Sequence, residues 1–207
     1  MLLDLDQLIE KYKMDIRGIY HVGAHHGQEY EVYKKYGIKN IIFFEPVYRT
    51  FKILEARLYG EPVTLVNAAL SNQKGRAKMF LEKQNEGQSS SLLKSKLHSD
   101  FYPHITFEEE TEVDVLTLDE YMKGAEVDKY NFLSLDTQGS ELMVLQGARE
   151  VLNHVDYIMT EVNSAELYEG CAQIEQLDEF LKPYGFERVE TYWVPGKYWG
   201  DSFYIKN

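Results

Sequence analysis

The stretch from Gly18 to Glu29 constrains the fold most, because an apolar run passes directly into a glycine turn and then into a helical pattern. Ile19, Tyr20 and Val22 predict a buried strand. In the turn Gly23-Ala-His-His-Gly27, glycines stand where side chains would obstruct a tight bend. A strand, a glycine turn and a helix at the start of an alternating α/β chain predict a nucleotide-type pocket at the carboxyl end of the strand.

A second apolar run, residues 41–44, ends in Glu45 and Pro46. An acidic residue roughly 20 residues after such a turn is typical of a side chain that binds ribose hydroxyls. The turn lacks the middle glycine of Gly-x-Gly-x-x-Gly, which brings backbone close to a pyrophosphate, and no basic residue stands nearby. The pattern favours a cofactor with a ribose but no phosphate, for which S-adenosylmethionine is the obvious example.

Strands and helices alternate along the rest of the chain. Further strands are predicted at about 63–67, 77–81, 112–116, 131–136, 156–162, 186–193 and 201–206, and helices at about 28–36, from Pro46 to before Gly60, and 172–182. This order predicts one α/β domain over residues 1–207, with a mostly parallel sheet and one antiparallel edge strand. Residues 2–13 predict a packing helix, and Thr117 with Glu120 forms a capping box at the start of a short helix.

Residues 82–110 differ in character, because they are polar and irregular and include Gly87-Gln-Ser-Ser-Ser91. A long irregular segment inside a compact domain is usually functional or mobile. We expect a lid over the pocket, in which serines could donate to the carboxylate of a cofactor; a solvated loop is the alternative. His98 and His104 in this segment are further candidates for the site.

Asp136 and Glu161 are the candidates for acid–base chemistry, because each lies where a predicted strand ends, on the rim where pockets form in α/β sheets. Two neighbouring carboxylates could share a proton and so provide a base, or could bind a hard divalent cation. Asp136 could also contact the cofactor. In the structural alternative, Asp136 caps the following helix and Glu161 pairs with a surface cation.

Two histidines lie in the glycine turn, where an imidazole could act as a base near neutral pH. His26 is the candidate base and His25 a candidate cofactor contact; turn residues bonded to backbone are the alternative. Near the end of the chain, Trp193 and Trp199 flank the turn at Pro195 and Gly196. An exposed indole beside the pocket could stack on a sugar face, although packing under the sheet edge explains it equally well.

Taken together, these motifs resemble the FkbM-type S-adenosylmethionine-dependent methyltransferases. The matching pieces are His21–Gly27, Phe44–Pro46, Asn67–Ser71, Val115–Asp119, Leu135–Ala148 and Thr160–Val162. The resemblance implies a Rossmann-like, seven-stranded sheet of order 3-2-1-4-5-7-6 with helices on both faces. Two positions depart from the family pattern: His21 stands where Asp or Glu is usual, and Gln138 where Glu is frequent. Glu29 is the candidate replacement for the missing carboxylate.

The matched motifs and the pocket argument give one expected set of cofactor-binding residues: His21, Gly23, Ala24, His25, Gly27, Glu29, Glu45, Pro46, Asn67, Ala68, Ser91, Asp136 and Thr137. No residue is assigned as a metal ligand. With the aromatic tail, the resemblance implies O-methylation of a sugar or glycan hydroxyl. An NAD-dependent oxidoreductase or epimerase of a nucleotide sugar, and a non-catalytic binding module on the same fold, are the alternatives.

Composition limits the partners. The net charge of −12 over 207 residues repels polyphosphate, so we expect no nucleic-acid substrate but a small-molecule or glycan acceptor. Hydrophobic content is ordinary, and no apolar run approaches the roughly 20 residues that a spanning helix needs, so we expect no membrane insertion. The single cysteine, Cys171, and the acidic first residues indicate a cytoplasmic protein.

Overall fold

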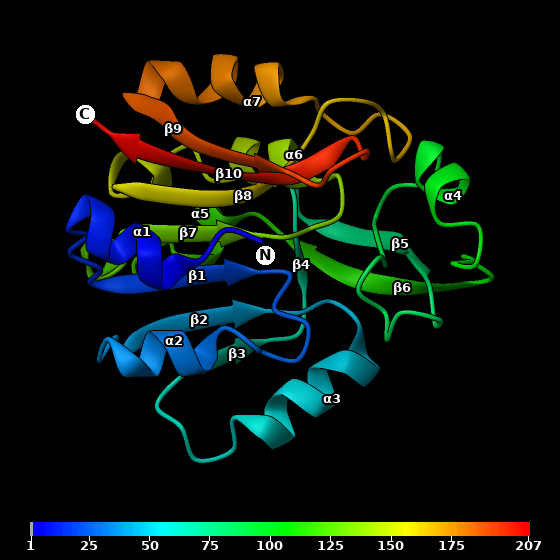
Figure 1. Ribbon diagram of the computed structural model, residues 1–207. Coiled ribbons are helices and arrows are strands. Elements are labelled where there is room, and N and C mark those ends of the chain that lie inside the picture. The colour runs from blue at the N-terminus through cyan, green and yellow to red at the C-terminus, as the bar shows by residue number, and fades with distance from the viewer. Residues whose placement is uncertain (1) are drawn as a thin grey trace.

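The computed structural model describes residues 2–207, and its main element is a seven-stranded sheet of order β3-β2-β1-β7-β8-β10-β9 (Figure 1). Its strands are β1 (Gly18–Val22), β2 (Asn40–Phe44), β3 (Thr64–Val66), β7 (Phe132–Leu135), β8 (Tyr157–Asn163), β9 (Phe186–Trp193) and β10 (Trp199–Lys206). Only β10 runs against its neighbours. Counted over these seven strands alone, the order is 3-2-1-4-5-7-6; the labels differ because three more strands form a second sheet.

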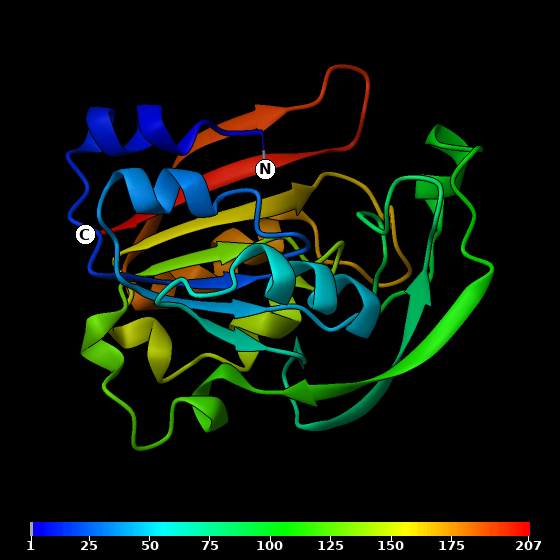
Figure 2. The ribbon, with the colours of Figure 1, turned by 90° about the horizontal axis from the view of Figure 1, so that it is seen from below.

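The second sheet lies beyond the carboxyl ends of the parallel strands (Figures 1 and 2). It contains β4 (Ala69–Leu70), β5 (Gly75–Leu81) and β6 (Glu109–Leu116) in the order β4-β6-β5. Both long strands extend further than their sequence patterns predict, and the two-residue β4 was not predicted because it is too short to show a period. The chain between β5 and β6 carries α4 (Leu97–Phe101), inside the segment that was predicted to be irregular.

Helices cover both faces of the main sheet. On one face lie α1 (Leu5–Tyr12), α2 (Tyr30–Lys35) and α3 (Tyr48–Arg57), which pack Leu8, Tyr33 and Leu54 against strand residues such as Phe43. On the other lie α5 (Leu118–Tyr121), α6 (Glu141–Gln146) and α7 (Ile174–Leu181). Short 3-10 turns occupy Val127–Lys129, Val151–Asn153 and Lys182–Tyr184. Among residues 2–207, no helix has the length and apolar character to cross a bilayer.

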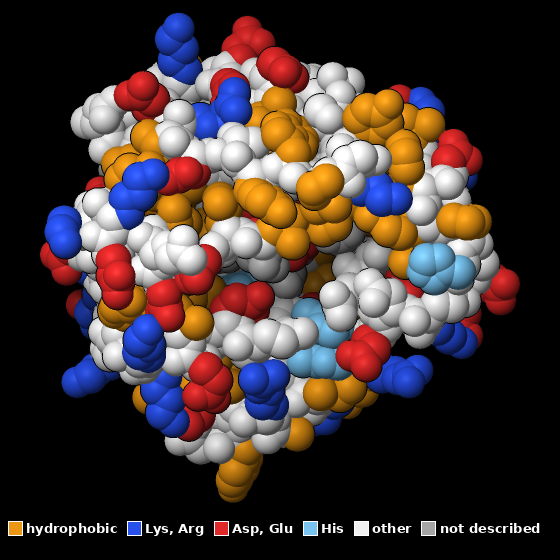
Figure 3. Space-filling model, in the orientation of Figure 1, with side chains coloured by type: hydrophobic (Ala, Val, Ile, Leu, Met, Phe, Trp, Pro, Cys, Tyr) orange, Lys and Arg blue, Asp and Glu red, His pale blue; other side chains and the backbone are white. Residues whose placement is uncertain are grey.

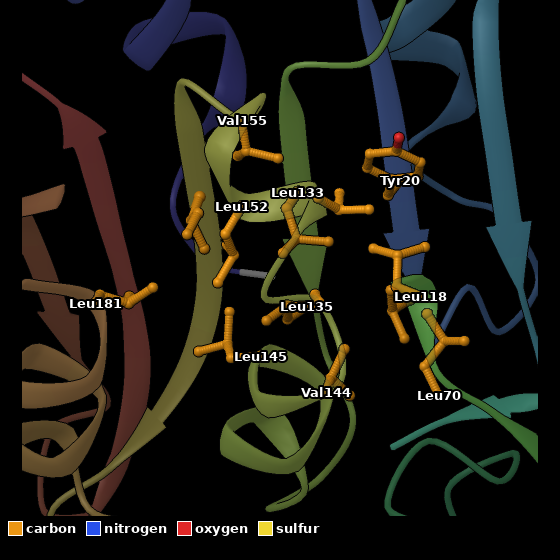
Figure 4. Close-up of a cluster of buried hydrophobic side chains, with 14 of the residues drawn as sticks. Tyr20, Leu70, Leu118, Leu133, Leu135, Val144, Leu145, Leu152, Val155 and Leu181 are labelled. Carbon is orange, nitrogen blue, oxygen red and sulfur yellow. The ribbon is translucent and has the colours of Figure 1, made fainter. Parts of the chain in front are cut away.

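The second face holds the larger core, in which fully buried leucines of β7 meet α6 (Figure 4). Helix boundaries differ from the sequence pattern where side chains bind backbone. The helix expected from Pro46 begins at Tyr48, because the Glu45 carboxylate accepts the Val47 N–H at 2.8 Å and holds Val47 extended. At the start of α5, the Glu120 N–H donates to Thr117 Oγ1 at 3.1 Å, which is the expected capping bond.

Gly23 joins the ends of three strands. Its N–H donates to the Phe44 carbonyl of β2, while Asp136 after β7 donates to Val22. Its φ is +80°, and a Cβ at this position would lie 1.8 Å from the Asp136 carbonyl oxygen. A side chain is therefore excluded both by backbone conformation and by space.

The substitution Gly23→Ala tests this close approach. Left-handed strain of about 1–2 kcal/mol and an overlap of about 1–3 kcal/mol should together lower the free energy of unfolding by roughly 2–5 kcal/mol in urea titrations. Gly37→Ala is the matched control, since Gly37 has φ +69° but nothing within 4 Å of the added Cβ. Equal losses in the two variants would show that strain alone governs the site.

Candidate cofactor and active site

Four carboxylates lie in one row along the carboxyl-end rim of the sheet. The last residues of β1, β2 and β7 pair side by side, and Leu135 of β7 is level with Thr160 of β8. The residues one position further on therefore also lie side by side; they are Gly23, Glu45, Asp136 and Glu161. On β10, Asp201 lies opposite Glu161. Because side chains alternate between faces, this row projects on one face. We call Glu45, Asp136, Glu161 and Asp201 the acidic row; Gly23 lies between the first two.

The acidic row lines a cavity of about 500 Å³, a volume typical of small-ligand sites. Figure 3 shows the hollow, with acidic and histidine side chains on its walls. Leu2, the glycine turn, residues after β3 and the segment 82–110 also contribute to the wall. Of the residues expected in the site, the cavity is lined by His21, Gly23, Ala24, His25, Glu29, Glu45, Pro46, Ala68, His98, Asp136, Thr137 and Glu161. His104, the other histidine candidate of the segment 82–110, does not line it.

Two turn residues expected in the site do not line the cavity. The His26 ring stacks on the His25 ring, with centroids 3.7 Å apart, and His25 occupies the wall. Gly27 faces α3, where a Cβ would lie 2.7 Å from Leu54 Cδ1. The second glycine of the turn thus serves helix packing, and the candidate base His26 lies behind its neighbour.

Asn67 and Ser91 are also outside the cavity wall, because their side chains bind backbone. Asn67 Nδ2 donates to the carbonyls of Glu45, at 2.8 Å, and Pro46, at 3.1 Å, and so fixes the end of β2. The fully buried Ser91 donates through Oγ to the Gln138 carbonyl at 2.6 Å. It ties the segment 82–110 to the turn after β7.

Glu45 is held by backbone amides. One carboxylate oxygen accepts the His25 N–H at 2.9 Å and the other accepts the Val47 N–H at 2.8 Å. The side chain is 6% exposed, and this burial raises the pKa of Glu45 to about 7 against the opposing effect of the two N–H groups. Its lone pairs beyond these two bonds remain as acceptors beside the glycine turn.

His25 and His21 contact different parts of the structure. His25 has φ 46°; its Nδ1 accepts from the Gln28 amide at 3.0 Å, so Nε2 donates to the Glu86 carbonyl at 2.9 Å and joins the turn to the segment 82–110. His21 contacts Tyr33 Oη through Nδ1 at 2.7 Å, and its Nε2 lies 3.9 Å from Glu29. Burial lowers the pKa of His21. The imidazole and Glu29 line the cavity together.

Gln138 connects the acidic row to the opposite wall. Its amide nitrogen donates to Asp136 at 2.7 Å and to Glu161 at 2.9 Å, and its carbonyl oxygen accepts from Tyr168 Oη at 2.9 Å. A glutamate here would add a negative charge and lose the donor. Burial, together with Asp136, Glu141 and Asp201, raises the pKa of Glu161 well above its usual range. Glu141 accepts the N–H groups of Thr137 and Gly139 at 3.0 and 3.1 Å, so it caps this turn.

Asp201 was not anticipated from the sequence. It is 1% exposed, lines the cavity and accepts the N–H groups of Leu2 and Leu3, the latter at 3.0 Å. Its position follows from topology, because an antiparallel strand begins at the rim where the parallel strands end. Among residues 2–207, no group of three or more His, Cys, Asp or Glu is placed to hold a metal ion.

Solved structures share this architecture. The magnesium protoporphyrin IX methyltransferase of Synechocystis PCC 6803, determined with bound SAM, is 9% identical, with a TM-score of 0.54 over 98% of this chain and 76% of that one. The 1,6-didemethyltoxoflavin-N1-methyltransferase of Burkholderia thailandensis is 12% identical, with a TM-score of 0.51 and coverage of 98% and 76%. The fold is therefore that of Rossmann-like methyltransferases.

The family follows from the sequence match. The family model described as the methyltransferase FkbM domain matches residues 21–188, and the chain belongs to this family. It is 28% identical over 134 residues to the 2-O-methyltransferase NoeI of Sinorhizobium fredii NGR234. The match covers 62% of this chain and 54% of that protein, so the chain spans about half the length of its curated relative.

The raised pKa of Glu45 makes stability depend on pH. Between its ordinary 4.5 and about 7, the folded protein holds the Glu45 proton more tightly than the unfolded chain does, so stability falls as pH rises through this window. The free energy of unfolding is measured in urea at pH 5 and at pH 8. From pH 5 to pH 8 it should fall by up to about 3 kcal/mol more in wild type than in Glu45→Gln, whose side chain cannot titrate. Identical pH dependence in both proteins would contradict this origin.

Proposed function

We propose that this chain is an S-adenosylmethionine-dependent O-methyltransferase acting on a hydroxyl of a sugar or glycan. The observation that carries the proposal is the acidic row, in which Glu45 stands beside the Gly23 turn in the position that suits a ribose. The family match and the 2-O-methyltransferase relative support the reaction type.

The residues of the cavity suit this cofactor. Glu45 would accept hydrogen bonds from the ribose hydroxyls, and the Gly23 turn would let backbone approach the nucleoside. His21 and Glu29 would contact the methionine end. The described lining residues include four carboxylates of the acidic row and no lysine or arginine, which favours a cationic sulfonium over a pyrophosphate. This charge distribution disfavours the NAD-dependent alternative. When bound, S-adenosylmethionine supplies an activated methyl group.

Glu161 is the proposed base. A hydroxyl that gains a methyl group must lose its proton, and a buried carboxylate with a raised pKa is a competent acceptor once a nearby positive charge favours its ionised form. Gln138 fixes the orientation of Glu161 and Asp136 by donating to both. The protein would otherwise act by positioning the acceptor oxygen in line with the methyl group.

The cofactor assignment is tested by calorimetry with S-adenosylhomocysteine. At pH 8, where Glu45 is ionised, Glu45→Gln should weaken binding roughly 10- to 150-fold, because hydrogen bonds to a charged group contribute about 1.5–3 kcal/mol. Glu31→Gln, on the exposed surface of α2, is the control and should bind as wild type does. Absence of heat with wild type, or equal affinity for both variants, would refute the assignment.

The role of Glu161 is tested by methyl transfer from labelled donor to a library of sugars and glycans. Glu161→Gln should transfer roughly 100- to 10,000-fold more slowly than wild type, the usual contribution of a general base, while binding S-adenosylhomocysteine normally. Glu175→Gln, exposed on α7, is the control. Undiminished transfer by Glu161→Gln would reject this base, and cofactor binding without transfer by wild type would favour a non-catalytic module.

A further inference from the structure

Beyond the acidic row, the cavity has a second wall built from aromatic side chains. We call His98, Tyr102, Leu167, Tyr168 and Trp199 the aromatic compartment; all five line the cavity. The His98 ring centroid lies 4.9 Å from that of Tyr102 and 5.4 Å from that of Tyr168. Trp199 Nε1 donates to Tyr102 Oη at 3.0 Å. Hydrophobic side chains border the hollow in Figure 3.

The compartment is held rigidly by backbone bonds. The His98 and Lys96 N–H groups both donate to the Leu167 carbonyl, at 3.1 and 2.8 Å, and Ser95 forms a bridge with Tyr168. Tyr168 also donates to Gln138, which binds Glu161. The aromatic compartment is therefore linked to the proposed base through Gln138.

His98 is the unexplained member of this wall. It is 5% exposed, and its Nδ1 is buried with no hydrogen-bond partner among residues 2–207. Its other nitrogen, Nε2, has no protein partner in the same part of the chain, yet it is not among the fully buried atoms, so it retains accessible surface. Burying an imidazole without partners costs free energy. A ligand in the cavity that bonds Nε2 would offset that cost.

The compartment has the chemistry of a neutral carbohydrate site. Aromatic faces stack on the apolar C–H faces of a sugar ring, while an imidazole and a phenol bond its hydroxyls. No lysine or arginine occurs among the described lining residues, and the nearby Lys197 lies over the Tyr102 ring at 4.5 Å and donates to the Phe101 carbonyl at 3.4 Å. A phosphate would meet carboxylates instead of cations.

We propose that the aromatic compartment binds an uncharged glycosyl unit, rather than a sugar phosphate or nucleotide sugar, with its ring against Trp199 and a hydroxyl bonded to His98. The proposal rests on the proposed function and specifies the acceptor and its subsite. It also distinguishes the two tryptophans, since Trp193 packs against the hydrophobic core and does not line the cavity.

The two tryptophans allow a direct test. Trp193→Phe leaves Trp199 as the only indole of the chain. With S-adenosylhomocysteine bound, this variant is titrated with the methyl glycosides of glucose, galactose, mannose, fucose, rhamnose and N-acetylglucosamine and with the corresponding sugar 1-phosphates. At least one glycoside should change Trp199 emission saturably, and its phosphate should bind roughly tenfold more weakly or not at all. Trp199→Phe, which keeps Trp193, should give no response.

Adding His98→Ala or His98→Asn to Trp193→Phe should raise the glycoside Kd roughly tenfold by removing one hydrogen bond. Calorimetry with S-adenosylhomocysteine is run on every variant. Normal cofactor binding by a variant shows that it is folded. If wild type does not bind S-adenosylhomocysteine, the proposed function is refuted, and not the subsite alone. When cofactor binding is intact, any of three results would overturn the subsite. These are no response to any glycoside, the same glycoside affinity in the His98 variants as in Trp193→Phe alone, or tighter binding of the sugar phosphates than of the glycosides.

Discussion

Removal of neighbouring carboxylates from water is the constraint on which the rest of this structure depends. Parallel register forces Glu45, Asp136 and Glu161 into one row, and antiparallel β10 adds Asp201. Like charges so close are costly in a low dielectric unless donors surround them or protons neutralise them. Both occur here: backbone amides bind Glu45 and Asp201, and the Gln138 amide bridges the middle pair. Burial also raises the pKa of Glu45 and of Glu161.

A separate set of polar bonds holds the chain between β5 and β6 beside the cavity. Ser91 binds the Gln138 carbonyl, His25 binds the Glu86 carbonyl, and α4 is anchored on Leu167. Each bond joins segments that are far apart in sequence. The segment therefore forms a wall through specific contacts with the rim, and its position depends on the conformation of both turns beneath it.

Much of the rim could be predicted from sequence because its determinants are local. An apolar run that ends in a glycine or a carboxylate identifies both a strand and its exposed end, which located Gly23, Glu45, Asp136 and Glu161. Asp201 was not predicted because, on a strand that runs in the opposite direction, residues near its start lie at the rim. Spacing could not tell which of His25 and His26 faces the cavity, since φ at His25 decides it. The sequence offered His98 and Trp199 as separate candidates, but it could not show that both line one cavity, since each reaches it through a tertiary contact with Tyr102.

The bonds from Leu2 and Leu3 to Asp201 make the start of the chain part of the cavity wall. In contrast, β10 carries the carboxyl terminus to the opposite end of the sheet (Figure 1). Any purification tag, reporter domain or surface tether joined ahead of Leu2 therefore begins at the mouth of the pocket. A group joined after Asn207 would instead lie at the end of the sheet away from the acidic row.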